Sequence, residues 1–224
     1  GDDREGLTNL LADRDLVLLS VGAPSPLAYE RTYLRTAEAL VAVIEKTPVR
    51  QVLYTGSYSV YGDRDGAWVD EETPPAPDTT NGRILLATEQ ILLGIERSVC
   101  ILRLGGIYGP GRALVDIFGW AAGETLPGDG SDWGNWIHRD DIVGALSFAA
   151  EQELSGVYNL VGDSPMTRRE LVEGVLAAHA LPPVQWDGAP PAGPRAYNAR
   201  VRNGRMRAAG YRLRRPTLDF VSES

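Results

Sequence analysis

The chain has 224 residues, of which 43% are hydrophobic and 23% charged, a composition that excludes disordered and collagen-like proteins. Its net charge of −8 disfavours broad binding to nucleic acid or to anionic membranes. No apolar run approaches the ~20 residues that cross a bilayer, and the single Cys100 cannot form an intrachain disulfide, so we predict a protein of the reducing cytoplasm with no metal site.

Strands and helices alternate along the first part of the chain. Residues 15–22 are a short apolar run, which predicts a strand buried on both faces. Residues 27–46 carry apolar side chains at helical spacing and end before Pro48, which predicts a helix. Residues 51–54 predict the next strand, and residues 63–80, rich in Gly, Pro, Asp and Thr, predict a long surface loop.

The same alternation continues to about residue 180. Thr167 and Glu170 form a capping-box pattern that opens a helix ending near Ala180. Repeated strand–helix units indicate an α/β fold, a doubly wound parallel sheet covered by helices, followed by a Pro-rich and then Arg-rich C-terminal lobe. The other elements predicted in this part are helices at 84–95, 112–122 and 140–151 and strands at 99–104 and 157–161.

Small residues follow three of the predicted strands, at 22–24, 55–57 and 104–106. Ligands of parallel sheets bind beyond the carboxyl ends of the strands, so these segments are the candidate binding edge. The glycines of residues 105–111 do not have the spacing of the dinucleotide fingerprint, and Pro110 has no N–H to offer a phosphate. We therefore interpret residues 105–111 as a ligand-lining turn rather than as a phosphate loop.

Basic residues concentrate near the C-terminus. Eight arginines and no acidic residue lie between Arg195 and Arg215, so the rest of the chain carries a net charge of −16. One interpretation is a site for a phosphate or carboxylate, because guanidinium groups match these anions. The other is a basic segment that docks on the protein's own acidic body.

Several motifs resemble the NAD-dependent epimerase/dehydratase family, which comprises extended short-chain dehydrogenases. Residues 55–62 (TGSYSVYG) resemble its catalytic-serine segment, and residues 68–74 resemble the loop that follows. The resemblance spans about residues 15 to 219. Its further motifs are Ile101-Leu102-Arg103 with Tyr108-Gly109-Pro110-Gly111, Gly128-Asp129-Gly130, Ile137-His138-Arg139-Asp140-Asp141 and Val157-Tyr158-Asn159-Leu160.

The resemblance implies a Rossmann-like domain over residues 1–180 that binds NAD or NADP. It also implies a small C-terminal lobe over residues 181–224, which draws on about 111–136. The implied activity is that of an oxidoreductase acting on a small-molecule substrate, and a homodimer is one assembly it suggests. By resemblance, the catalytic position is Ser57, the cofactor contacts are Gly22, Ala23, Pro24, Thr55, Gly56, Leu104, Gly105 and Gly106, and the substrate contacts are Tyr108, Arg112 and His138.

The sequence departs from the family pattern at three places. The family opens with a strand, a glycine-rich loop and a second strand that are absent here, so we expect the native polypeptide to be longer. The family's catalytic tyrosine and the lysine four residues later correspond to Asn81 and Leu85. An amide does not titrate in the useful range and leucine carries no charge, so the usual acid–base chemistry is predicted to be missing. Gly134 replaces an arginine of nucleotide-sugar members, which argues against a UDP-sugar substrate.

Three functions stay open from the sequence. The first is an oxidoreductase with a degenerate catalytic pair, and the second is a non-catalytic module that senses NAD(P)H or binds a partner. The third is an active enzyme that uses another acid, Tyr58 or Tyr108. Ser57 either orients a substrate oxygen or is a turn serine. For the remaining candidates we favour structural roles, namely packing for Tyr61, a buried inert thiol for Cys100 and loop-holding for His138, whereas Trp133 and Trp136 either pack in their loop or cover a ligand or an oligomer contact.

Overall fold

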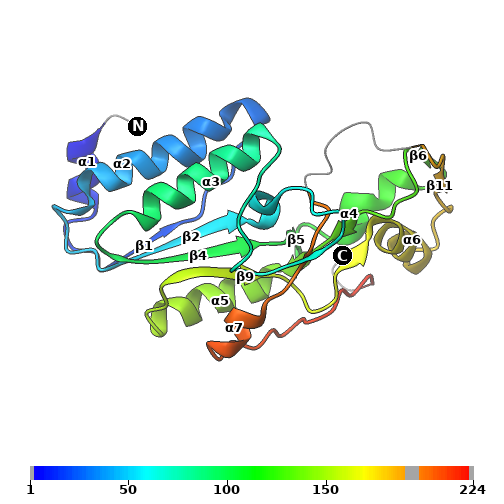
Figure 1. The fold of residues 1–224 in the computed structure, drawn as a ribbon. Helices are drawn as coiled ribbons and strands as arrows, with labels where there is room; N and C mark the ends of the chain where they lie inside the picture. Colours follow the sequence, from blue (N-terminus) through cyan, green and yellow to red (C-terminus); the bar gives the residue numbers. More distant parts are fainter. Residues whose placement is uncertain (1–2, 190–196, 222–224) are drawn as a thin grey trace.

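Four parallel strands form the centre of the structure, a computed structural model that describes residues 3–189 and 197–221 (Figure 1). Register brings the carboxyl ends of the strands to one edge, because Ser57 pairs with Leu104 and Leu104 pairs with Leu160. The predicted parallel α/β sheet is therefore confirmed. The strands, in spatial order, are β1 (Leu16–Leu19), β2 (Gln51–Ser57), β4 (Ser98–Leu104) and β9 (Gly156–Leu160).

Helices cover both faces of this sheet. On one face, α1 (Arg4–Leu10), α2 (Arg35–Ile44) and α3 (Thr80–Leu93) lie above the strands, and α5 (Arg139–Glu151) lies on the other (Figure 1). Successive side chains of a strand point to opposite faces of the sheet, so alternate residues pack against the helices on the two faces. The first core joins Val52, Tyr54 and Ile101 to Ala37, Leu40 and Ile44, and the second joins Leu53, Cys100 and Leu102 to Ile142, Ala145 and Ala149.

Strand β1 is less buried than its apolar sequence predicts. Leu19 is buried, but Leu18, whose side chain points to the opposite face, is 45% exposed. β1 is the end strand of the sheet within the described residues, and the buried strand residues of the core under α5 come from β2, β4 and β9, with the partly buried Leu16 of β1 packed against them. The prediction that both faces of this strand are buried is therefore wrong.

The predicted helix at 27–46 is built from three kinds of turn. A 3₁₀ turn at Pro26–Ala28 and a π-helical turn at Glu30–Leu34 precede α2. Helix α3 begins at Thr80, four residues before the predicted start, because the Thr79 side chain accepts a hydrogen bond from the Gly82 N–H and caps it.

Two further predictions of helices differ in outcome. The predicted helix at 112–122 is only α4 (Leu114–Phe118) with a 3₁₀ turn at Gly119–Ala121. Helix α6 (Arg168–Ala178) has the predicted capping box, in which the Thr167 hydroxyl accepts from the Glu170 N–H and the Glu170 carboxylate accepts from the Thr167 N–H. That prediction is confirmed.

Short strand pairs connect segments that are distant in the sequence. β3 (Trp68–Val69) lies inside the predicted surface loop and pairs with β12 (Arg200–Val201). β5 (Gly106–Tyr108) pairs with β8 (Trp136–His138), so residues 106–108 are a strand rather than part of a turn. The remaining elements are the 3₁₀ helix η3 (Tyr58–Tyr61), helix α7 (Gly204–Ala208) and the pairs β6 (Thr125–Leu126) with β11 (Gln185–Trp186) and β7 (Trp133–Gly134) with β10 (Met166–Thr167).

Helices α4 and α6 gather with β6 and β11 at one end of the molecule (Figure 1). Tyr108 and Leu114 pack there against Leu171 and Val175 of α6. The division of the chain into two domains at residue 180 stays a prediction. In the part of the chain that the structure describes, none of the helices combines the length and apolar character needed to span a bilayer.

Candidate functional site

The segments predicted to form the binding edge meet at the carboxyl ends of the strands. Ser57 ends β2, beside Leu104 at the end of β4. The Thr55 hydroxyl donates to Ser20 Oγ at 3.2 Å, which ties β2 to the residues that follow β1. Ser57 Oγ accepts from the Ser59 N–H at 3.2 Å and so caps η3. The hydroxyl proton of Ser57 is left over to donate, so both interpretations of this serine stay open.

Packing inside the protein explains three of the four glycines predicted at this edge. A Cβ on Gly56 would lie 3.2 Å from Glu89 Oε1, and one on Gly105 would lie 2.8 Å from the Asn135 carbonyl oxygen. A Cβ on Gly106 would lie 2.8 Å from the Trp136 ring. Gly22 differs, because no atom lies within 4 Å of the position of its Cβ. Of these four, only Gly22 faces open space.

Helix α3 places Asn81 and Leu85 one turn apart. Its first turn packs against η3, since a Cβ on Gly82 would lie 3.4 Å from the Ser59 carbonyl oxygen. The helix therefore starts beside the turn that Ser57 caps. Leu85 is 4% exposed and Asn81 is half-buried. This helix carries neither a phenol at position 81 nor a cation at position 85.

No other tyrosine–lysine pair takes their place at the edge. Lys46 is the only lysine in the sequence, and it lies just after the C-terminal end of α2. The chain continues from Lys46 to the first residue of β2, Gln51, at the amino end of the sheet. This lysine is therefore at the opposite edge from Ser57.

The tyrosines near this edge of the sheet are packed inside the protein. Burial raises the pKa of the Tyr58 phenol to about 12, and its hydroxyl donates to the Tyr197 carbonyl at 3.4 Å. Burial also raises the pKa of Tyr61, whose hydroxyl donates to Asn159 Oδ1 at 2.9 Å. Tyr108 is buried with its ring 5.1 Å from that of His138. These contacts favour packing over acid catalysis for Tyr58, Tyr61 and Tyr108.

His138 and Arg112 hold loops through hydrogen bonds. His138 is the N-cap of α5, and its Nδ1 accepts from the Asp140 N–H at 3.1 Å. The side chain of His138 is buried, as the predicted loop-holding role requires. Arg112 is exposed and its Nε donates to the Ile107 carbonyl at 3.0 Å.

Cys100 and Trp136 make packing contacts inside the protein. Cys100 is fully buried in β4, so its predicted burial is confirmed, and burial raises the pKa of its thiol to about 12, which favours the predicted inert role. The Trp136 ring packs edge-on against Phe118 at 5.4 Å between ring centroids and covers Gly106. These contacts favour loop packing for Trp136.

A buried ion pair under α3 was missed from the sequence. Glu89 of α3 accepts two bonds from Arg103 of β4, at 3.1 Å from Nε and at 2.7 Å from Nη2. Both side chains are almost fully buried, and the Arg103 guanidinium lies 4.8 Å from the centre of the Tyr61 ring. The signal that was present is an arginine in an otherwise apolar strand, since such a residue needs a buried partner.

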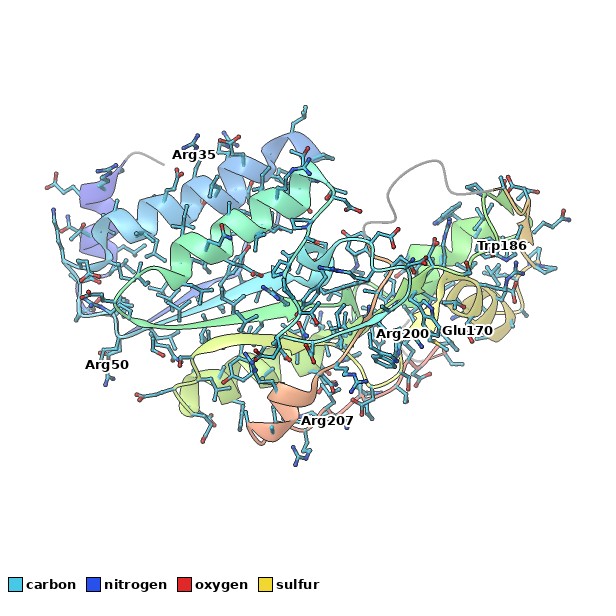
Figure 2. The ribbon with its side chains drawn as sticks, in the orientation of Figure 1. Arg35, Arg50, Glu170, Trp186, Arg200 and Arg207 are labelled. Atoms are coloured by element: carbon cyan, nitrogen blue, oxygen red, sulfur yellow. The ribbon has the colours of Figure 1, made fainter. Side chains whose placement is uncertain are left out.

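The C-terminal arginines contact the body of the protein (Figure 2). Arg205 forms an ion pair with Glu72, and Arg207 forms one with Asp163. Arg200 donates to the Gly66 carbonyl at 2.7 Å and stacks on Trp68 and Trp133, at 5.1 and 4.9 Å from the ring centres. Arg195 lies outside the described residues. These contacts favour docking on the protein's own surface over a dedicated anion site, and they favour packing for Trp133.

Two surface hollows lie on other parts of the described chain. One, of about 680 Å³, lies between residues 47–50 and 95–98 at the amino ends of β2 and β4. The other, of about 470 Å³, lies between the outer side of α5 and Tyr211 and Arg214. Neither is lined by a residue predicted to contact cofactor or substrate.

Comparison with known proteins gives one family and consistent relatives. The model of the NAD dependent epimerase/dehydratase family matches residues 19–161. Protein YeeZ of Escherichia coli K12 is 32% identical over 178 residues, which cover 79% of this chain and 63% of YeeZ. The chain therefore spans less than two thirds of the length of this relative.

Solved structures share the fold. A functionally unknown conserved protein from Silicibacter pomeroyi is 28% identical, with a TM-score of 0.72, over 90% of this chain and 73% of its own. MoeE5, solved in complex with UDP-glucose and NAD, is 25% identical, with a TM-score of 0.76, over 93% of this chain and 77% of its own. The arrangement of strands and helices described above is thus that of a known architecture.

Proposed function

Since the chain belongs to the NAD dependent epimerase/dehydratase family, we propose that it is an NAD(P)-binding protein of oxidoreductase type whose catalytic acid–base pair has been replaced. The cofactor site is the edge formed by the carboxyl ends of β1, β2 and β4. Support comes from the parallel sheet, because ligands of such sheets bind at that edge.

The residues at this edge fit a dinucleotide in part. Gly22 has open space where a side chain would be, and Gly22 and Pro24 are exposed, so a ligand can approach this backbone. The Ser57 hydroxyl can donate to a ligand oxygen while it accepts from the Ser59 N–H. When bound, NAD(P) supplies hydride exchange with a small-molecule substrate. The chain's own residues contribute backbone contact and orientation.

The observation that carries the proposal is the composition of α3. Asn81 and Leu85 stand where the family has its tyrosine and lysine, and Lys46, the only lysine in the chain, lies at the far edge. A side-chain amide does not exchange protons near neutral pH, and a buried leucine cannot lower the pKa of a neighbour. Proton transfer at this edge therefore lacks its usual donor.

A second candidate function is a non-catalytic NAD(P)H-binding module that senses the cofactor or steadies a partner. The state of the remaining phenols favours it. Tyr58 has a pKa of about 12 and its hydroxyl is engaged with a backbone carbonyl. A phenol in that state is a weak acid at neutral pH, so it does not substitute for the missing pair.

Titration of the intact protein with NADH and NADPH, followed by nicotinamide fluorescence, tests the binding site. We expect saturable binding of at least one of them. Gly22→Val is expected to weaken binding at least tenfold by filling the open space. Gly204→Val is the control, because Gly204 also has open space around it but starts α7, away from the proposed site. The absence of a saturable signal with either nucleotide would contradict the proposal.

A further inference from the structure

Strand β9 is the last strand of the sheet within residues 3–189 and 197–221, so one of its edges has no neighbouring strand. Open strand edges carry unpaired N–H and C=O groups that can pair with another chain, and proteins usually protect them. Two of the groups on this edge of β9 are the Val157 carbonyl and the Asn159 N–H, which bond to side chains outside the sheet.

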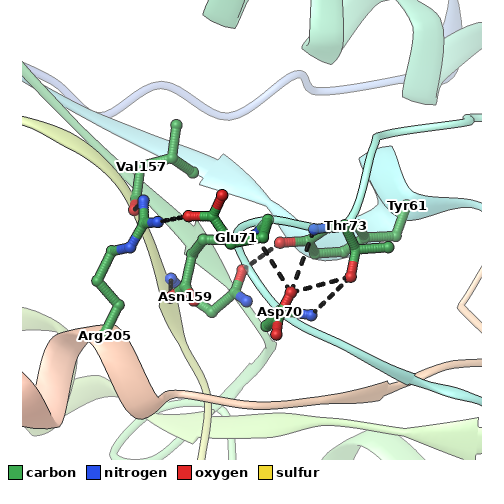
Figure 3. Close-up of polar contacts among 8 residues, drawn as sticks. Tyr61, Asp70, Glu71, Thr73, Val157, Asn159 and Arg205 are labelled. Carbon is green, nitrogen blue, oxygen red and sulfur yellow. Dashed lines mark hydrogen bonds and ion pairs between the residues drawn. The ribbon is translucent and has the colours of Figure 1, made fainter.

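Side chains from two distant segments bond to these groups (Figure 3). The Asn159 N–H donates to Glu71 Oε1 at 2.7 Å. Arg205 Nη1 donates to the Val157 carbonyl at 3.1 Å. Arg205 also forms an ion pair with Glu72, so the loop that carries Glu71 and Glu72 is joined directly to α7 across the edge. One donor and one acceptor of the β9 edge are therefore satisfied by side chains.

We propose that Glu71 and Arg205 form a latch that takes the place of a fifth strand and keeps β9 from pairing with a second copy of the chain. In a parallel sheet, a residue bonds to the two neighbours of the residue that lies opposite it. Its N–H donates to the carbonyl of the preceding neighbour, and its carbonyl accepts from the N–H of the following neighbour. The residue opposite such a partner is Tyr158. The guanidinium of Arg205 supplies the donor of that partner, and the carboxylate of Glu71 supplies its acceptor.

Two further sets of contacts hold the latch in position. Asp70 Oδ1 accepts from the N–H and the hydroxyl of Thr73, at 3.1 and 3.0 Å, which closes the turn that presents Glu71. The buried Asn159 side chain donates from Nδ2 to the Arg202 carbonyl at 3.0 Å, near the start of α7. The turn that carries Glu71 is thus closed by bonds within the loop, and the segment that leads into α7 is tied to β9.

The protection of a single amide tests the contacts of the latch. In the intact protein, we expect Glu71→Ala to increase hydrogen exchange at the Asn159 N–H at least tenfold, measured by NMR or by mass spectrometry. Glu71→Gln keeps an oxygen acceptor and is expected to preserve the protection to within about threefold. Glu96→Ala removes an exposed carboxylate at the other end of the sheet and is the matched control. Unchanged exchange at Asn159 in Glu71→Ala would overturn the proposal.

The mass of the protein in solution tests the guarding role. We expect Glu71→Ala combined with Arg205→Met to form larger species as its concentration rises, measured by light scattering after size exclusion. Arg205→Met retains the aliphatic stem, so the packing of α7 is kept. A folded double variant that has the wild-type mass at every concentration would overturn the guarding role. If the double variant does not fold, the same measurement on Arg205→Met alone decides, with a weaker shift expected.

Discussion

The buried ion pair of Glu89 and Arg103 helps to determine where helix α3 lies on the sheet. Both charges are buried, and burial of an unpaired charge costs several kcal/mol, so each residue requires the other. Gly56 belongs to the same arrangement, because a side chain there would press on the Glu89 carboxylate. Three residues from α3, β2 and β4 therefore hold the helix that carries Asn81 and Leu85 against the sheet.

Replacement of Arg103 tests this arrangement. We expect Arg103→Met to lower the free energy of unfolding by about 3–5 kcal/mol, because it leaves the Glu89 carboxylate buried without a partner. Arg35→Met breaks exposed ion pairs to Glu30 and Glu38 and is expected to cost less than about 1 kcal/mol. Urea unfolding of both variants measures the difference. Equal losses in the two variants would show that the buried pair does not hold the fold.

At the scale of elements, local signals in the sequence predict more than distant contacts do. The capping box of α6 lies within four residues of sequence, and it forms as predicted. The β3–β12 pair joins Trp68 to Arg200 through two residues on each side, and no periodicity marks strands that short. The loop at 63–80 looked like solvated surface for the same reason, because Glu71 and Glu72 find their partners only after the chain has folded.

The loop that carries Glu71 gives the unfolding free energy a defined dependence on pH. Burial raises the pKa of the Glu71 carboxyl above its ordinary value. A carboxyl with a raised pKa stabilises the folded state at low pH, and this contribution is lost as the pH rises through the folded-state pKa. Glu71→Gln does not titrate, so we expect it to gain stability relative to the wild type between pH 4 and pH 7.5.

Urea midpoints of the wild type and Glu71→Gln at the two pH values measure this dependence, with Glu96→Gln as a control for the loss of one exposed carboxylate. The opposite sign, in which the wild type gains on Glu71→Gln as the pH rises, would mean that Glu71 is stabilised as a charged group. In that case desolvation would not be the main influence on its pKa.

At the scale of the whole molecule, the parallel sheet could be predicted from the sequence, the replaced pair stays a prediction, and the origin of the glycines could not be predicted. Alternating apolar segments predict a parallel sheet, and Asn81 and Leu85 are identified by motif alignment alone. The glycines at 56, 105 and 106 suggested a ligand, but packing against Glu89, Asn135 and Trp136 accounts for them. Those contacts join residues up to 33 positions apart, so only the folded chain reveals them.

The rate of NAD(P)H oxidation with carbonyl substrates measures the effect of the proposed loss of the family's acid–base pair. We expect the intact wild-type protein to be slow and Asn81→Tyr combined with Leu85→Lys to be faster by roughly 10²–10⁴, the usual contribution of a positioned acid. Leu85→Met alone is the packing control and should stay slow. A wild-type protein that turns over at ordinary enzyme rates, on the order of 1–10³ s⁻¹, would contradict the account.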